Sequence, residues 1–282
     1  MPKSLTTAQV AAYRRDGYVF PLSGFSEQEM AEYRRRLFEL EAKEGGKLSK
    51  RTNQKPHLLL PWLNKMIRDP RILDAVEDVL GPNLLAWSSG FFYKRAHDPS
   101  YISWHQDSTY WGLSSPDVMT AWVAFTPSTV DNGCMRVVPG SHLTQLSHTE
   151  TYAEDNMLSR GQEVEARVDE KDAVDIILKP GHFSLHHVQI IHGSEPNRSD
   201  RPRIGYTIRY IPTHVRQLSP VRDNATLVRG VDEFHHYDLD PVPEREFEPA
   251  MVRYHDEVLE RATRILYAGA KKVREYEPLK AM

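Results

Sequence analysis

The stretch Trp104-His105-Gln106-Asp107 decides more about this chain than any other, because it sets an imidazole and a carboxylate two residues apart. On a β-strand, residues i and i+2 point to the same face. His105 and Asp107 on one strand would therefore aim at a single point. A second imidazole from another strand would complete two histidines and one carboxylate on one face of a metal, the facial triad of non-haem Fe(II) oxygenases. An isolated His-x-Asp pair is more often a hydrogen-bonded or solvated strand end.

The other parts of such a site are available downstream. His192, in Ile190-Ile191-His192-Gly193-Ser194, is the candidate for the second imidazole, and Arg203 opens a later β-like run. A guanidinium binds a carboxylate bidentately and stays charged. Arg203 could therefore hold the distal carboxylate of a dicarboxylic cosubstrate whose other end chelates the metal. The alternative for Arg203 is a surface or salt-bridge arginine.

Five motifs follow one another in a recognisable order. They are Trp104-His105-Gln106-Asp107, Thr120-Ala121-Trp122-Val123-Ala124, Asp131-Asn132-Gly133-Cys134-Met135, Val138-Pro139-Gly140-Ser141-His142, and Ile191-His192-Gly193-Ser194 with Arg203 after it. This order resembles that of the phytanoyl-CoA dioxygenase family. The resemblance covers nearly the whole chain and weakens after about Thr213.

The resemblance implies a mainly β protein with flanking α-helices, whose core is a double-stranded β-helix of the cupin-like, jelly-roll type. It implies an Fe(II) ion held by His105, Asp107 and His192, with O2 as the oxidant. The cosubstrate 2-oxoglutarate would bind the metal and Arg203, and Ser194 and Trp122 match positions that contact it in relatives. Related halogenases lack the carboxylate ligand, so Asp107 favours hydroxylation. No residue points to coenzyme A, so an acyl-CoA substrate is not implied.

Apolar periodicity and turn signals predict one domain over residues 1–282, assembled from three parts. These are a mostly helical part over 1–83, a β-helix core over 84–212, and a C-terminal loop and helix over 213–282. Capping boxes at Thr6 and Ser26 are expected to open two helices, and 249–268 is expected to form a closing helix. The polar stretch 141–168 is long for a loop and could cover the mouth of a site.

Four further side chains are candidates for binding the substrate: Lys94, Tyr110, Trp111 and Arg209. Lys94 lies on a strand that leads toward the site and could bind an anionic group, with a solvated strand-end lysine as the alternative. Arg209 has the strand parity of Arg203, so both could face inward, with a buried ion pair as the alternative. Tyr110 and Trp111 could wall a pocket or stack on a cation, or they could pack in the core.

The composition of the chain excludes several classes of protein. Its 282 residues carry a formal net charge of -3 with 40% hydrophobic residues, which is ordinary for a globular protein and gives no basic footprint for nucleic acid. The single cysteine, Cys134, excludes an internal disulfide. No apolar run predicts a membrane span or a signal peptide, so we expect a cytoplasmic protein with a small-molecule substrate. The oligomeric state is not predicted.

Three other functions compete with hydroxylation of a small molecule. The same iron and 2-oxoglutarate could serve desaturation, cyclisation or epimerisation. A non-redox, cupin-like binding module would hold a metal but would not need Arg203 at its position. An oxygenase that modifies proteins would need an open groove, which the polar insertion over 141–168 disfavours.

Overall fold

The fold is built on a large antiparallel sheet, one face of which packs against helices while the other lines a cavity. The computed structural model describes residues 2–270, and in this part of the chain seven strands form the sheet in the order β1-β9-β4-β11-β2-β12-β13. All neighbours are antiparallel except β12 and β13. The strands are β1 (Tyr18–Ser23), β2 (Leu84–Lys94), β4 (Met119–Ala124), β9 (His182–His187), β11 (Arg203–Pro212), β12 (Asn224–Arg229) and β13 (Asp238–Leu239).

Side chains on the central strands alternate between a helix-covered face and a cavity face. On β11, Ile204 and Tyr206 are fully buried in the core beneath the helices. Arg203, Thr207 and Arg209 have the opposite parity and line a cavity. A bulge in the pairing of β11 with β2 lies after Arg209, so this parity holds from Arg203 to Arg209. The prediction that both arginines face inward is confirmed.

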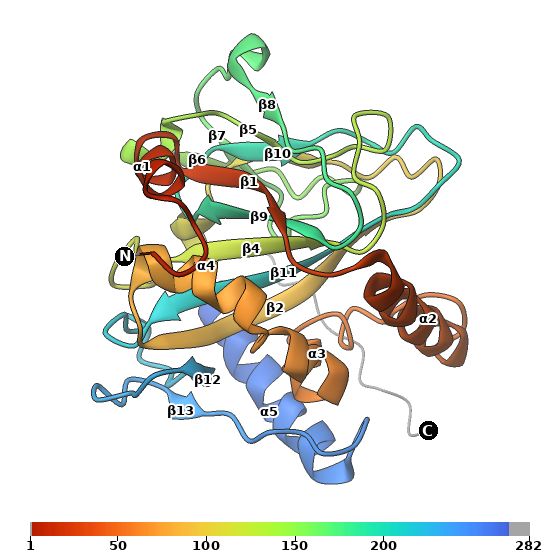
Figure 1. Cartoon of the computed structure of the whole chain (residues 1–282), viewed down its shortest axis with the longest axis vertical. Coiled ribbons are helices and arrows are strands. Elements are labelled where there is room, and N and C mark those ends of the chain that lie inside the picture. The colour runs from red at the N-terminus through yellow and green to blue at the C-terminus, as the bar shows by residue number, and fades with distance from the viewer. Residues whose placement is uncertain (1, 271–282) are drawn as a thin grey trace.

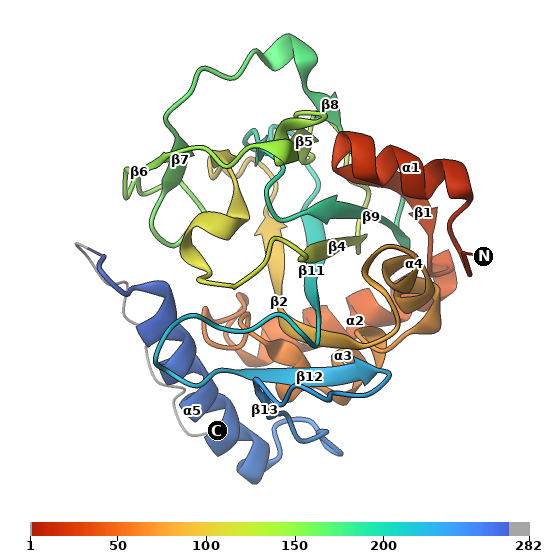
Figure 2. The same ribbon diagram turned by 90° about the vertical axis from the view of Figure 1, so that its left-hand side faces the viewer.

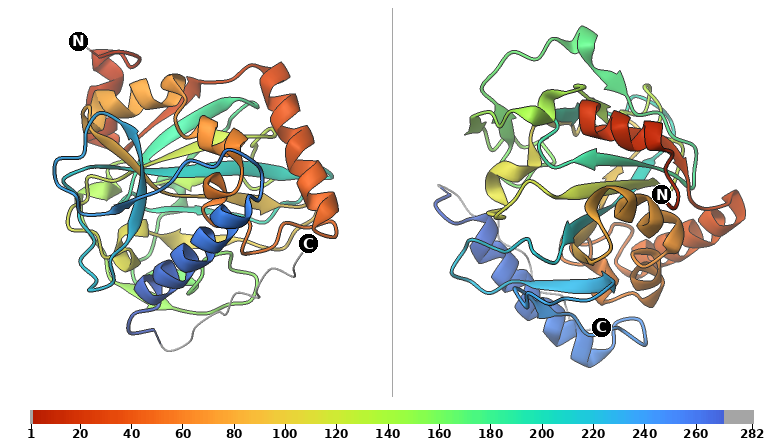
Figure 3. Two further views of the ribbon diagram at one scale, coloured as in Figure 1. Left: turned by 90° about the horizontal axis from the view of Figure 1, so that it is seen from below. Right: turned by 60° about the vertical axis from the view of Figure 1, so that its left-hand side comes forward.

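Four helices cover the outer face of the large sheet, and a fifth lies on the other side (Figures 1 and 2). The helices are α1 (Thr7–Asp16), α2 (Glu27–Lys43), α3 (Pro61–Met66), α4 (Pro70–Leu80) and α5 (Pro249–Leu266). Both predicted capping boxes are present, at Thr6 with Gln9 and at Ser26 with Glu29. Seen from below, α5 crosses in front of the sheet (Figure 3). No helix within residues 2–270 is long and apolar enough to pass through a bilayer.

A smaller sheet completes the jelly roll and carries two of the candidate metal ligands. Its strand order is β3-β10-β5-β8, and a separate hairpin pairs β6 with β7. The strands are β3 (Ile102–His105), β5 (Arg136–Val137), β8 (Val174–Asp175), β10 (His192–Ser194), β6 (His148–Glu150) and β7 (Gln162–Val164). Four short 3-10 helices lie between strands or helices: η1 (Pro56–Leu58), η2 (Asp107–Tyr110), η3 (Ser141–Leu143) and η4 (Glu170–Asp172).

Two expected loops contain strands. Residues 213–282 were expected to hold a loop and a helix, but β12 and β13 lie there and extend the large sheet. The sheet also takes β1 from the N-terminal part, so it reaches beyond 84–212 on both sides. Within 141–168, β6 and β7 form a hairpin. Both regions were misread because their strands are short and rich in polar residues, which depend on pairing rather than on an apolar pattern.

Candidate active site

Strand pairing brings His105 and His192 together across 87 positions of sequence. The two residues are direct partners in the antiparallel ladder of β3 and β10. Their ring centroids lie 4.1 Å apart. Partners in such a ladder have neighbouring Cβ atoms on the same face, so the pairing alone places both imidazoles on one side.

Asp107 reaches the same point, although it is not on the strand. β3 ends at His105, and Asp107 opens a short 3-10 helix, η2. The residue between them, Gln106, keeps an extended backbone with φ −116° and ψ 131°. The i, i+2 relation therefore survives where the strand has ended, and this corrects the expectation of a single strand. The Asp107 Oδ1 atom lies 3.4 Å from His105 Nε2, and Oδ2 lies 4.0 Å from His192 Nε2.

The orientation of both imidazoles suits a metal ligand. The Nδ1 atom of His105 lies 2.9 Å from the Ser103 carbonyl, and that of His192 lies 3.0 Å from the Ile190 carbonyl. A carbonyl accepts only an N–H, so each Nδ1 carries the proton and each Nε2 presents a lone pair. The ligand atoms of His105, Asp107 and His192 all lie within 4.8 Å of one another. The three residues therefore fit one divalent metal ion.

Electrostatics keep His192 and Asp107 in the states that bind metal. Burial, followed by the nearby His105, holds the pKa of His192 well below its usual value, so its imidazole is neutral at neutral pH. Burial would by itself raise the pKa of Asp107, but the facing His105 and His192, when they carry a proton in the metal-free site, and the Arg209 guanidinium hold that pKa below its usual value. A neutral imidazole and an ionised carboxylate are the forms that coordinate a metal.

Arg203 lies beside the three candidate ligands and has no carboxylate partner among residues 2–270. The ligands share with it a cavity of about 420 Å³, part of it open to solvent, that is also lined by Trp122 and Ser194. Arg203 is 1% exposed; its Nη1 atom makes one long contact of 3.4 Å to the Phe92 carbonyl, and its Nε and Nη2 atoms have no hydrogen-bond partner in the described part of the chain. Burial lowers the pKa of Arg203 to about 10, which still leaves it charged at neutral pH. A buried guanidinium without a partner is costly, so this cavity fits a molecule that brings a carboxylate.

Trp122 and Ser194 both line the smaller cavity beside Arg203. The Arg203 guanidinium lies over the Trp122 ring, 5.6 Å from its centroid. The Ser194 hydroxyl lies 2.7 Å from the Lys94 ammonium, which donates to it. Since a hydroxyl that accepts one bond can still donate its own proton, Ser194 keeps a donor for a ligand.

Neither of the two roles expected for Lys94 is found in the structure. It is fully buried rather than solvated, and it is absent from the residues that line the cavity. Its ammonium donates to the Ser194 hydroxyl and to the carbonyls of Ser194 and Glu195. Burial, with Arg203 close by, lowers the pKa of Lys94 to about 6. Lys94 thus lies behind Ser194 as a support, because its strand is paired with β11 at Arg203.

A second, larger chamber adjoins the first. Its volume is about 1240 Å³, part of it open to solvent, and it shares Phe92, Asp107 and Arg209 with the smaller cavity. Tyr110 and Trp111 line it, as expected for a pocket wall. Residues of the polar insertion also line it, namely Met157, Leu158, Ser159 and Gln162. The predicted covering role of 141–168 is therefore confirmed for these residues.

The sequence over residues 13–205 matches the phytanoyl-CoA dioxygenase family. This match spans more than half of the chain. The chain belongs to the phytanoyl-CoA dioxygenase family. Solved structures of similar proteins agree with this fold.

Three relatives illustrate how closely this phytanoyl-CoA dioxygenase family member resembles known proteins. A non-heme monooxygenase, ThoJ in its apo form, is 33% identical, covers 94% of this chain and 100% of its own, and superposes with a TM-score of 0.83. CytC3 with Fe(II) and alpha-ketoglutarate is 26% identical over 87% of this chain and 96% of its own, with a TM-score of 0.65. A probable alpha-ketoglutarate-dependent hypophosphite dioxygenase from Stutzerimonas stutzeri is 30% identical over 60% of each chain. The chain thus matches less than two thirds of that last relative's length.

Several cavity residues of this family member were missed from the sequence. Thr120 and Thr207 line the smaller cavity, and strand parity with Trp122 and Arg203 could have found them. The adjacent pair His186-His187 already suggests from the sequence that one ring points inward, and His186 does so: it lines the cavity, with its ring centroid 5.2 Å from that of His192. The contribution of α5 to the larger chamber has no local signal, because it depends on where the helix docks.

Proposed function

We propose that this protein is an Fe(II)- and 2-oxoglutarate-dependent hydroxylase of a small-molecule substrate. The proposal rests on one observation: His105, Asp107 and His192 converge in the cavity that holds the Arg203 guanidinium, which has no anionic partner among residues 2–270. A metal site alone would suit a non-redox binding module. In such a module, a buried cation beside the metal site would have no function if no anion paired with it. The same cation would bind the second carboxylate of a dicarboxylic cosubstrate.

Each residue then has a defined task. His105, Asp107 and His192 would hold Fe(II), and three protein ligands would leave it able to bind further ligands. Arg203 binds the distal carboxylate of 2-oxoglutarate, and the Ser194 hydroxyl donates a hydrogen bond to it. Trp122 flanks the cosubstrate. Because Asp107 occupies a coordination position, it leaves no place there for a halide, which supports hydroxylation.

The iron with its cosubstrate supplies the oxidative chemistry, in which O2 converts 2-oxoglutarate to succinate and CO2 and a substrate C–H bond becomes C–OH. The protein supplies position and exclusion of water. Arg203 and both histidines are 8% exposed or less, so the cosubstrate is held away from bulk solvent. Low solvent access strengthens the hydrogen bonds and ion pairs that orient it.

The binding half of this proposal is tested without knowledge of the substrate. The purified protein is loaded anaerobically with Fe(II) and 2-oxoglutarate, and the visible charge-transfer band of the chelate is titrated. We expect a band in the wild type and none in His105→Ala. His214→Ala, which changes an exposed histidine, is the matched control and should keep the band. A full band in His105→Ala would reject the site.

The reaction half is tested by exposing the loaded protein to O2 with a panel of small organic acids. Succinate release above the level without added acid identifies accepted substrates. The product mass then separates the outcomes: hydroxylation adds one oxygen atom, desaturation or cyclisation removes two hydrogen atoms, and epimerisation leaves the mass unchanged. Products without an added oxygen would overturn the hydroxylase assignment.

A further inference from the structure

The larger chamber begins where the metal site ends. Phe92, Asp107 and Arg209 line both cavities, so a molecule in the larger chamber lies next to Asp107, one of the three candidate ligands. Arg209 is the basic residue that both cavities share. Its position therefore bears on which substrate can reach the site.

The Arg209 guanidinium lacks the partners that a buried cation needs. Its Nε atom is buried without a hydrogen-bond partner, and its Nη1 atom has only a long contact of 3.4 Å to the Thr207 hydroxyl. Within residues 2–270 no carboxylate oxygen lies within 4.0 Å of it. The guanidinium lies over the Trp111 ring, 5.1 Å from the centroid, which orients it without neutralising it.

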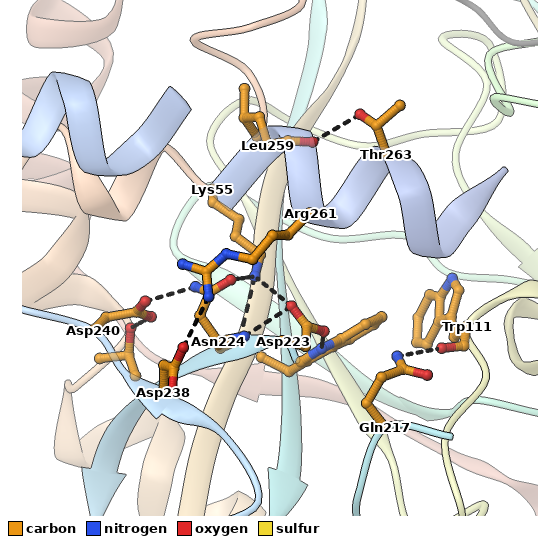
Figure 4. A network of polar contacts seen from close by, with 12 residues as sticks. Lys55, Trp111, Gln217, Asp223, Asn224, Asp238, Asp240, Leu259, Arg261 and Thr263 are labelled. Carbon is orange, nitrogen blue, oxygen red and sulfur yellow. Dashed lines mark hydrogen bonds and ion pairs between the residues drawn. The ribbon is translucent and has the colours of Figure 1, made fainter. Parts of the chain in front are cut away.

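The other basic side chain of the chamber is already satisfied (Figure 4). The Lys55 ammonium lies 3.0 Å from the Asn224 side-chain oxygen and 3.9 Å from an Asp223 carboxylate oxygen. Asp223 in turn accepts a hydrogen bond of 2.6 Å from the Trp87 indole. The charge of Lys55 is therefore already paired within the protein, whereas the charge of Arg209 faces the chamber.

The charges of the loaded site leave Arg209 in excess. The two positive charges of Fe(II) are matched by Asp107 and by the carboxylate of 2-oxoglutarate that chelates the metal. Arg203 is matched by the other carboxylate of 2-oxoglutarate. Lys94, whose pKa burial lowers to about 6, is largely uncharged at neutral pH and donates to neutral oxygens behind Ser194. Arg209 then remains as a positive charge whose nearby anion, Asp107, is already matched by the metal, at the junction where the substrate would lie.

The chamber has an apolar and aromatic part beside polar residues such as Asn53, Ser88 and Gln162. The Trp87 and Trp111 rings pack together with centroids 5.2 Å apart. Helix α5 contributes Leu259, Ala262, Ile265 and Leu266 to the wall. These walls suit a flat or apolar body, because burying it against them removes apolar surface from water.

We propose that Arg209 binds an oxyanion group of the primary substrate, a carboxylate or a phosphonate, while its apolar body lies between the Trp87–Trp111 pair and α5. This assignment rests on the proposed function and names the substrate class for it. The anchored group places a neighbouring carbon beside the metal. The chemistry recognised is therefore an organic acid with a hydrophobic portion.

The test uses the full-length protein loaded with Ni(II) and 2-oxoglutarate, which binds without turnover. The probes are 4-phenylbutyrate, 4-phenylbutylphosphonate and the neutral 4-phenylbutyramide, with binding measured by calorimetry. We expect one or both acids to bind at least about tenfold more tightly than the amide, as a charge-assisted hydrogen bond predicts. In Arg209→Gln this preference should vanish, while Arg209→Lys should keep part of it. The acid that binds more tightly identifies which oxyanion is used.

The variants also separate this assignment from the proposed function. Arg198→Gln changes an exposed arginine and should behave as the wild type. Arg209→Gln should bind 2-oxoglutarate as the wild type does. If it instead loses the metal or 2-oxoglutarate, Arg209 positions Asp107 and the substrate assignment is wrong. Equal binding of acids and amide by a loaded wild type would also overturn it, whereas a wild type that binds no 2-oxoglutarate rejects the proposed function itself.

Discussion

At Gly205 on β11 a single hydrogen atom makes room for the Trp122 ring. A Cβ atom there would lie 1.9 Å from the nearest ring carbon of Trp122, far inside van der Waals contact. The close approach follows from pairing, since β11 and β4 are neighbours in the sheet. Trp122 in turn lies against the Arg203 guanidinium. Position 205 therefore requires glycine because there is no space for a side chain, and not because of its backbone conformation.

Gly205→Ala should therefore displace Trp122 and disturb the smaller cavity. We expect unfolding to become easier by about 1–3 kcal/mol, the usual cost of overpacking, together with weaker 2-oxoglutarate binding. Chemical denaturation and the anaerobic charge-transfer titration measure the two effects. In Gly205→Ala combined with Trp122→Leu, stability should recover because the two residues are in contact. A single variant as stable as the wild type would show that the ring can move freely.

The Arg203→Lys variant separates the contribution of the guanidinium geometry to 2-oxoglutarate binding from the contribution of the positive charge. Lysine keeps the positive charge but loses the two parallel N–H donors that match a carboxylate. We expect the affinity for 2-oxoglutarate to fall roughly 10- to 100-fold, which corresponds to the loss of one or two charged hydrogen bonds. Titration of the anaerobic Fe(II) complex measures it, with Arg198→Lys as the control. An unchanged affinity would mean that Arg203 does not contact the cosubstrate.

Among the elements, α5 depends on one buried histidine at its base. Met251 and Val258 of this helix pack against Leu58, and the Nε2 atom of His255 lies 2.7 Å from the Gln54 carbonyl. His255 is fully buried. Burial lowers its pKa from 6.5 to about 4. Because α5 forms one wall of the larger chamber, protonation of His255 at low pH would also disturb that wall.

Acid should loosen α5 through His255. The unfolded chain binds a proton at this residue more tightly than the folded chain does, so the contribution is complete above pH 6.5 and is lost as the pH falls toward 4. The full loss is roughly 3 kcal/mol. Denaturation at a series of pH values should show a shallower decline below pH 6.5 for His255→Gln than for the wild type. Parallel curves would mean that His255 does not titrate on unfolding.

For the whole molecule, the metal site joins parts of the chain that are distant in sequence. The ligands come from β3, η2 and β10, and the cosubstrate cation comes from β11. A ligand that binds only this assembled arrangement stabilises the folded state by mass action. Metal and cosubstrate should therefore act on global stability and not only on the cavity.

Addition of Mn(II) and then 2-oxoglutarate should raise the thermal midpoint stepwise. A ligand at a hundredfold excess over its Kd contributes about 2.7 kcal/mol. Calorimetry or circular dichroism measures the shift, and a chelator should reverse it. His105→Ala should lose the metal step, whereas His214→Ala should keep it. An equal shift in His105→Ala would locate the bound ion elsewhere.

Local chemistry in the sequence determined much of this protein. The capping boxes at Thr6 and Ser26, the parity of Arg203 and Arg209, and the spacing of His105 and Asp107 all depend on backbone geometry over a few residues. Such features are readable because a helix cap or an i, i+2 relation is complete within its own segment. The sequence also offered His192 as the candidate second imidazole, and the family resemblance supported that choice.

Only the tertiary structure decided what surrounds those residues. Lys94 became a buried support for Ser194 because β2 pairs with β11, and α5 became a chamber wall because of where it docks. The unmatched charge of Arg209 likewise appears only once every possible partner is placed. Burial, charge pairing and cavity shape are sums over residues remote in sequence, so no local pattern encodes them.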